Sequence, residues 1–183
     1  MLFFYAVLII LFLIIFFFVL SYNKFVKLKN HIDEALSSID VQLKRRYDLI
    51  PNLIEIVKGY AKHEQNTLEK VINARNVAQN AKNFSEKAKA ENILTETLKS
   101  LFALAESYPD LKANQNFLDL QKTLKEIEEN IQYARRYYNA EVRDYNILCE
   151  SFPTNIIAQM FLFKKRDFFE ISESERENVK ITF

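Results

Sequence analysis

The chain has 183 residues, a formal net charge of +1 and a single glycine, Gly59. Because glycine supplies the backbone angles of tight hairpins and phosphate-binding loops, this composition excludes most β-sandwiches, dinucleotide-binding folds and P-loop proteins. The near-zero charge gives no overall field that would favour nucleic acid as a partner. Good helix formers dominate the remainder, so we predict an all-α protein.

Residues 2–20 form an uninterrupted apolar segment, LFFYAVLIILFLIIFFFVL. As a helix this segment spans about 28 Å, close to the roughly 30 Å hydrocarbon core of a bilayer. A cleaved signal peptide would have a basic n-region, a shorter apolar stretch and small residues at a cleavage site. We therefore expect residues 1–21 to be a retained, single-pass transmembrane anchor.

Three lysines follow this segment directly: Lys24, Lys27 and Lys29. Positive charge beside a membrane span favours the cytoplasmic side. We expect the N-terminus outside and the remainder of the chain in the cytoplasm.

Residues 22–150 read as four amphipathic helices that form an antiparallel four-helix bundle. A long coiled-coil dimer is the alternative. In the first helix, one face carries Phe25, Leu28, Ile32, Ala35, Ile39 and Gln42. We expect it to end near Arg45 and Arg46, with Asp48 as the N-cap of the second helix and Pro51 in its first turn. One long helix kinked at Pro51 is the alternative that we favour less.

The three later helices follow from apolar spacing and capping residues. The second carries Leu53, Val57, Tyr60, Thr67, Val71, Ala74, Ala78 and Ala81, and Gly59 within it suggests close packing or a local bend. Ser85 is the expected cap of the third, whose stripe is Ala90, Leu94, Thr97, Leu101 and Leu104. Asn114 is the expected cap of the fourth, which carries Phe117, Leu120, Leu124, Ile127, Ile131, Ala134, Tyr138, Val142, Tyr145 and Cys149.

Residues 151–183 form a separate C-terminal segment. A turn at Phe152–Asn155 precedes a short helix, for which Asn155 is the expected cap. This helix packs on the end of the bundle, or it touches the inner leaflet with Lys164, Lys165 and Arg166 on anionic lipid. We expect the last dozen residues, with Glu173, Glu175 and Glu177, to be a solvated tail.

No motif identifies an enzyme, a metal site or a cofactor site. Neither His31 nor His63 follows a glutamate at the spacing of di-metal bundles, and one cysteine with two separated histidines makes a poor zinc site. Cys149 cannot form an internal disulfide, and we expect it to be a small apolar residue on a helix face. We predict no catalytic residue, no metal and no cofactor.

Polar residues nevertheless fall at positions that face the interior of the bundle. These are Gln42, Arg46 and Glu64. Four more polar residues, Arg135, Arg136, Asn139 and Asn146, lie in the last half of the fourth helix. For these polar residues we favour a buried Glu–Arg pair that sets helix register over a binding pocket. We expect the neighbouring Tyr137 to lie at the rim of the bundle and Tyr138 in its core.

Several segments together resemble the LemA family: IDVQLKRRYDLIPNLIEIVKGYAKHE at 39–64, AR at 74–75, AESYPDLKANQNF at 105–117, ARRYYNAEVRDYN at 134–146 and FPTNIIA at 152–158. The leading apolar helix and YNKFVKLKN are also similar, whereas residues 171–183 lie outside the resemblance. The residues that carry the family motifs are Arg45, Arg46, Asp48, Pro51, Gly59, His63, Glu64, Pro109, Arg135, Asn139, Asn146 and Pro153. The resemblance implies a bacterial inner-membrane protein with a cytoplasmic four-helix bundle, and it assigns no reaction or residue role.

The expected function is a membrane-tethered protein-interaction scaffold or adaptor. Its expected partners are the lipid bilayer and either an unknown protein or a second copy of the chain, with no nucleic acid. A self-associating, membrane-organising protein is the alternative, and a metal-binding or enzymatic bundle is the less favoured one.

Overall fold

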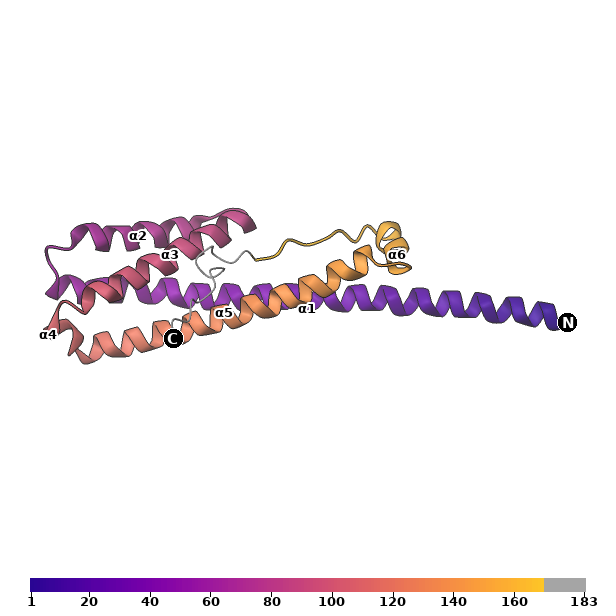
Figure 1. The fold of residues 1–183 in the computed structure, drawn as a ribbon, viewed down its shortest axis with the longest axis horizontal. Helices are drawn as coiled ribbons and strands as arrows, with labels where there is room; N and C mark the ends of the chain where they lie inside the picture. Colours follow the sequence, from indigo (N-terminus) through magenta and orange to yellow (C-terminus); the bar gives the residue numbers. More distant parts are fainter. Residues whose placement is uncertain (170–183) are drawn as a thin grey trace, which may run out of the picture. The chain divides into compact units, whose positions relative to one another are not determined.

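The structure is a computed structural model that describes residues 1–169, and within this part every regular element is a helix (Figure 1). The helices are α1 (Leu2–Tyr60), α2 (Gln65–Asn80), α3 (Phe84–Ala105), α4 (Pro109–Lys112), α5 (Gln115–Glu150) and α6 (Thr154–Met160). The prediction of an all-α protein is therefore confirmed. The solvated tail expected around Glu173, Glu175 and Glu177 lies outside the described residues.

The described chain divides into two compact units, and α1 and α5 each contribute to both. We call Met1–Ser38 with Ala134–Phe168 the anchor unit, and Ile39–Tyr133 with Phe169 the bundle unit. The domain boundaries expected after residues 21 and 150 stay predictions.

The start of α1 is long and apolar enough to cross a bilayer. Its side chains from Leu2 to Leu20 are exposed, except that Phe18 is half-buried. The core helix of a soluble protein would bury its apolar side chains against a partner, whereas these have none within the described chain. This exposure supports membrane anchoring.

The predicted turn at Pro51 is wrong, because α1 continues through Pro51 to Tyr60 as one helix of 59 residues. Asp48 lies inside this helix and is not an N-cap. The first break of the bundle comes instead at residues 61–64. Proline cannot donate to the carbonyl of the residue four positions earlier, which here is Tyr47. The Arg75 Nε donates to that carbonyl at 2.8 Å, so the acceptor that Pro51 leaves open is satisfied by α2.

In the anchor unit, residues 21–38 of α1 pack against residues 134–150 of α5. The core contains Phe25, Ile32, Ala35, Ala134, Tyr138, Val142, Tyr145, Ile157 and Ala158. The Phe25 ring meets the Tyr145 ring edge-on at 5.8 Å and stacks on the Phe163 ring at 4.7 Å. Burial of Ile157 and Ala158 shows that α6 packs within the anchor unit, and its expected place on the end of the bundle stays a prediction. The Phe152–Pro153 peptide bond is cis.

In the bundle unit, four helical segments with short connections alternate in direction: residues 39–60 of α1, α2, α3 and residues 115–133 of α5 (Figure 1). The core contains Ile39, Leu43, Ile50, Leu53, Val57, Leu68, Val71, Leu94, Leu98, Leu101, Leu111, Phe117, Leu124, Ile127 and Ile131. The predicted stripes are mostly buried. In α3, Leu98 is buried whereas the predicted Thr97 and Leu104 are only half-buried. At position 97 the buried face of the helix is therefore displaced by one residue from the prediction.

Of the three predicted caps of the later helices, one is confirmed. The Asn114 Oδ1 accepts a hydrogen bond from the Phe117 N–H at 3.0 Å at the start of α5. The cap of α3 is Asn83, not Ser85, and its side chain accepts from the Glu86 N–H at 2.8 Å. Asn155 lies inside the first turn of α6 rather than before it, and the N-cap position is occupied by Pro153.

Candidate functional site

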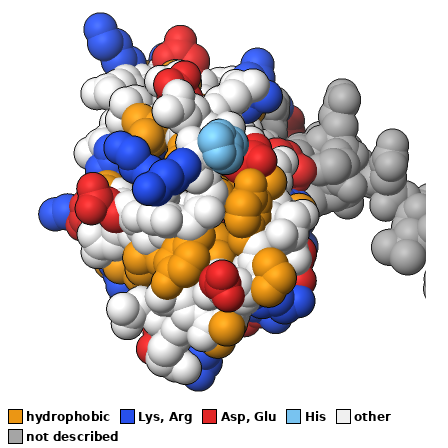
Figure 2. All heavy atoms as spheres, turned by 90° about the vertical axis from the view of Figure 1, so that its left-hand side faces the viewer, with side chains coloured by type: hydrophobic (Ala, Val, Ile, Leu, Met, Phe, Trp, Pro, Cys, Tyr) orange, Lys and Arg blue, Asp and Glu red, His pale blue; other side chains and the backbone are white. Residues whose placement is uncertain are grey.

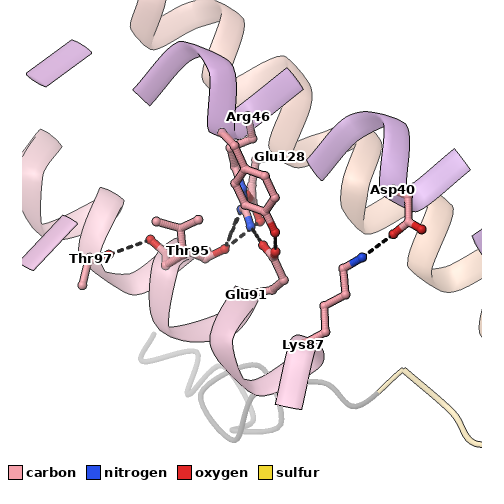
Figure 3. A network of polar contacts seen from close by, with 9 residues as sticks. Asp40, Arg46, Lys87, Glu91, Thr95, Thr97 and Glu128 are labelled. Atoms are coloured by element: carbon pink, nitrogen blue, oxygen red, sulfur yellow. Dashed lines mark hydrogen bonds and ion pairs between the residues drawn. The ribbon is translucent and has the colours of Figure 1, made fainter. Parts of the chain in front are cut away.

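A charged cluster lies inside the bundle unit and joins three of its helices (Figure 3). Arg46 of α1 places Nη2 against the Glu91 carboxylate of α3 and Nη1 at 2.5 Å from Glu128 Oε2 of α5. The side chains of Arg46 and Glu91 are each 1% exposed, and that of Glu128 is 23% exposed. The guanidinium is therefore surrounded by protein and linked to two carboxylates.

Hydroxyl groups complete the contacts of this ion cluster. The Arg46 Nη1 donates to Thr95 Oγ1 at 3.0 Å, and the Thr95 hydroxyl lies 3.3 Å from Glu128 Oε1. The Tyr47 hydroxyl donates to Glu91 Oε1. One atom, Arg46 Nε, is buried without a hydrogen-bond partner among the described residues. Each carboxylate thus has charged and neutral donors, which is what burial of a charge requires.

The composition of the cluster suits a structural role better than catalysis. An arginine holds its proton at all ordinary pH values and cannot act as a general acid or base there. The two carboxylates already share the guanidinium as counter-ion. Among the residues that the structure describes, no three His, Cys, Asp or Glu side chains gather to hold a metal ion.

A buried Glu–Arg pair is present as expected, but its carboxylate is Glu91, which the sequence reasoning missed. Helical spacing indicates a buried position for Glu91, since it stands three residues before Leu94 and seven before Leu98 and so shares their helix face. Glu64, the expected candidate, lies in the connection before α2 and accepts a hydrogen bond from the Tyr108 hydroxyl at 3.0 Å. This bond to the Glu64 carboxylate raises the pKa of Tyr108.

The structure does not bring the family-motif residues into one site. Arg45, Asp48, Pro51, Gly59, His63, Pro109 and Pro153 are exposed, and Arg136 and Tyr137 are exposed as well. Arg46 and Arg135 are buried, whereas Glu64, Asn139 and Asn146 are half-buried. Tyr138 is buried beside exposed Tyr137, so the expected core and rim assignment is confirmed. Lys24, Lys27 and Lys29 are exposed after the apolar segment.

Asn146 holds the segment that follows α6. Its Nδ2 donates to the Arg166 carbonyl at 2.9 Å, and its Oδ1 accepts from the Arg166 N–H at 2.9 Å. The Tyr138 hydroxyl donates to the Asp167 carbonyl at 3.0 Å. Two side chains of α5 thereby satisfy the backbone of an extended segment as a neighbouring strand would.

An open groove of about 830 Å³ runs between the end of α1 and the start of α2 in the bundle unit. Its lining combines apolar Ile54, Leu68 and Ile72 with polar Glu55, Lys58, Lys62, Gln65 and Glu69. Gly59 also lines it, and a Cβ added there would meet nothing within 4 Å. The expectation of close packing at Gly59 is therefore wrong. Figure 2 views this end of the bundle unit, where hydrophobic side chains gather among basic and acidic ones.

Cys149 lies half-buried on α5, with Sγ 3.9 Å from the Phe163 carbonyl oxygen. Burial raises the pKa of its thiol, although a hydrogen bond with Tyr145 opposes the shift. A raised pKa leaves little thiolate near neutral pH, and the thiolate is the nucleophile. The placement agrees with the expected role as a small apolar residue.

Comparison with known proteins gives one family and a few relatives. A sequence model of the LemA family matches residues 35–183. Protein LemA of Metamycoplasma hominis is 28% identical over 158 residues, which cover 86% of this chain and 72% of that protein. Magnetosome protein MamQ 2 of Paramagnetospirillum magneticum is 22% identical, and magnetosome protein MamQ of Magnetospirillum gryphiswaldense is 21% identical. The matches cover 83% and 82% of this chain, and 65% of each MamQ protein.

The matched region corrects one expectation. Residues 171–183 lie inside the family match, not outside it, because that match runs to Phe183. The apolar segment at residues 2–20 precedes the matched region.

Proposed function

We propose that this chain, which belongs to the LemA family, is a membrane-anchored adaptor whose cytoplasmic helical bundle binds another protein. The observation that carries the proposal is the open groove between α1 and α2. Its apolar floor with a rim of both charge signs is the composition of a protein-binding surface. A partner helix that presents apolar side chains toward Ile54, Leu68 and Ile72 would suit this lining.

In this proposal the chain acts by binding rather than by catalysis. The family description and the names of the relatives denote no enzyme. Arg46 and Glu91 are sealed from solvent, and burial raises the pKa of the Cys149 thiol. These features favour binding over reaction.

A photo-crosslinking residue at Ile72 in full-length protein tests the groove in intact cells. We expect one reproducible adduct from Ile72 and none from Tyr133, an exposed aromatic position in the same unit that does not line the groove. Gly59→Trp should remove the adduct by filling the groove, whereas Gly59→Ala should keep it. Adducts that are absent, or equal at both positions, would refute the proposal.

We propose further that the bundle lies in the cytoplasm. Exposed Lys24, Lys27 and Lys29 follow the apolar segment directly, and such lysines favour the cytoplasmic side. A reporter that works only in the cytoplasm, fused after Phe183, should be active. Activity of an export-only reporter at that position would reverse the orientation.

Self-association is a second candidate function, favoured by the outer face of the α2–α3 hairpin. Val77 and Ile93 are exposed there and line a shallow groove of about 310 Å³. A contiguous apolar patch on the outside of a bundle can mark an interface, whereas isolated apolar side chains do not. If this function holds, Val77→Asp should convert an oligomer of the full-length protein in detergent to a monomer, as measured by light scattering. A wild-type protein that is monomeric at all concentrations would remove this candidate.

A further inference from the structure

The turn and helix at residues 152–162, which we call the foot, expose a concentration of apolar side chains. Phe152, Met160 and Leu162 are 81%, 61% and 78% exposed, and Ile156 and Phe161 are also exposed. In the same segment Ile157 and Ala158 are buried. The foot therefore packs on its own unit through one side and leaves a second apolar side that no element of residues 1–169 covers.

The foot lies beside the point where α1 leaves its apolar segment. The Tyr22 ring is 4.8 Å from the Phe161 ring and 5.8 Å from the Phe163 ring. Ser21 is buried and Phe18 is half-buried, although the preceding side chains of α1 are exposed. Since the apolar segment ends at Leu20, the foot lies beside the last helical turn of that segment.

We propose that the foot inserts into the interfacial region of the same membrane leaflet from which α1 emerges. The occupant of its apolar surface is the lipid itself, because Phe161 of the foot contacts Tyr22, two residues after the last residue of the apolar segment of α1. A segment of this kind lies in the plane of the membrane with its apolar side about 5–10 Å below the phosphates.

The charges around the foot suit a lipid surface that carries anionic headgroups. Lys24, Lys27 and Lys164 are exposed on the two neighbouring segments. Lys165 pairs with Glu150 at 2.6 Å, and Arg166 faces Asp33 at 3.7 Å, so part of the positive charge is compensated. Long lysine side chains can lie along the apolar surface and place their ammonium groups among the phosphates.

Single tryptophans provide the test, because the chain contains none. Met160→Trp, Tyr133→Trp and Phe12→Trp would each be made in the full-length protein. Each variant is reconstituted into phosphatidylcholine–phosphatidylglycerol vesicles with and without brominated acyl chains. Tyr133 is the matched control, since its 69% exposure is close to the 61% of Met160 and it lies on α5 in the bundle unit.

We expect brominated lipid to reduce the emission of Met160→Trp about twofold and to leave Tyr133→Trp almost unchanged. Aqueous iodide should quench the two variants in the reverse order. Equal quenching at positions 160 and 133 by both agents would overturn the proposal. Phe152→Trp, an aromatic replacement, provides a second reporter if Met160→Trp does not fold.

The inference rests on membrane anchoring by α1, which Phe12→Trp tests separately. Strong quenching of Phe12→Trp by brominated lipid without quenching at position 160 would support membrane anchoring by α1 and refute insertion of the foot. Absence of quenching at Phe12→Trp would refute membrane anchoring by α1, and with it the insertion of the foot.

Discussion

Arg46 carries its charge in the core of the bundle unit, where an unmatched charge is very costly. Its guanidinium meets Glu91 and Glu128, so the charges compensate one another although water is excluded. Replacing such a group as a whole by apolar side chains can be neutral, but breaking it by removing one partner is not. Because each partner comes from a different helix, the contacts favour one relative register of α1, α3 and α5.

Loss of Arg46 alone should therefore be severe. We expect Arg46→Met to lower the free energy of unfolding by about 3–5 kcal/mol, since the buried Glu91 carboxylate would lose the guanidinium with which it pairs. Arg46→Met with Glu91→Gln should recover part of this loss, because the remaining amide carries no charge. Urea unfolding of the full chain in mild detergent, followed by circular dichroism, measures both.

Arg45 offers the matched control for this experiment, because it neighbours Arg46 but is exposed. Arg45→Met should change the free energy of unfolding by less than about 0.5 kcal/mol. Equal costs at positions 45 and 46 would show that the cluster does not stabilise the bundle unit.

The raised pKa values of three groups in the anchor unit predict a loss of folding stability at alkaline pH. Burial raises the pKa of Cys149, Tyr138 and Tyr145 above their ordinary values of 9.0, 10.0 and 10.0. The folded chain then holds these protons to higher pH than the unfolded chain. Their contribution is complete below the unfolded values and declines as pH rises through the folded ones.

We expect the melting temperature in detergent to fall above about pH 9, and to fall less steeply in Tyr145→Phe. Thermal melts followed by circular dichroism over this range give the measurement. A melting temperature that rises with pH would contradict the direction of these shifts.

At the scale of the element, α1 shows how a helix can continue through a proline. An interior proline usually costs about 3 kcal/mol because a hydrogen bond is lost and the ring crowds the preceding turn. Arg75 of α2 supplies a donor to the Tyr47 carbonyl that Pro51 leaves open. The predicted turn failed because local sequence shows the missing donor but not the arginine that replaces it from another helix.

A double-mutant cycle tests this compensation. In the native background, Arg75→Met should cost about 1–3 kcal/mol, because the buried Tyr47 carbonyl loses its partner. In a Pro51→Ala background the alanine N–H can bond to that carbonyl, so the same change should cost clearly less. Equal costs of Arg75→Met in both backgrounds, measured by urea unfolding, would refute the compensation.

At the scale of the whole molecule, the chain forms two compact units that share two continuous helices. The ion cluster belongs to the bundle unit, whereas the bonds of Asn146 to Arg166 belong to the anchor unit. Local stability commonly follows such contact groups, so opening of one unit need not open the other.

Hydrogen exchange of full-length variants should reveal this division. Asn146→Ala should speed amide exchange in residues 134–168 more than in α2 and α3, and Glu91→Gln should do the reverse. Mass spectrometry of peptides from each unit provides the measurement. Uniform acceleration throughout the chain by either change would show a single cooperative unit.

The sequence by itself determined the helical class, the apolar anchor, the stripes of α5 and the cap at Asn114. These features depend on periodicity, composition and residues within one turn of each other, all of which are local. Only the tertiary structure decided that α1 continues past Pro51, that Glu91 is the partner of Arg46, and that Gly59 lines an open groove. Each of these depends on which side chains of distant helices meet, and hydrophobic spacing within one helix carries no information about its partner.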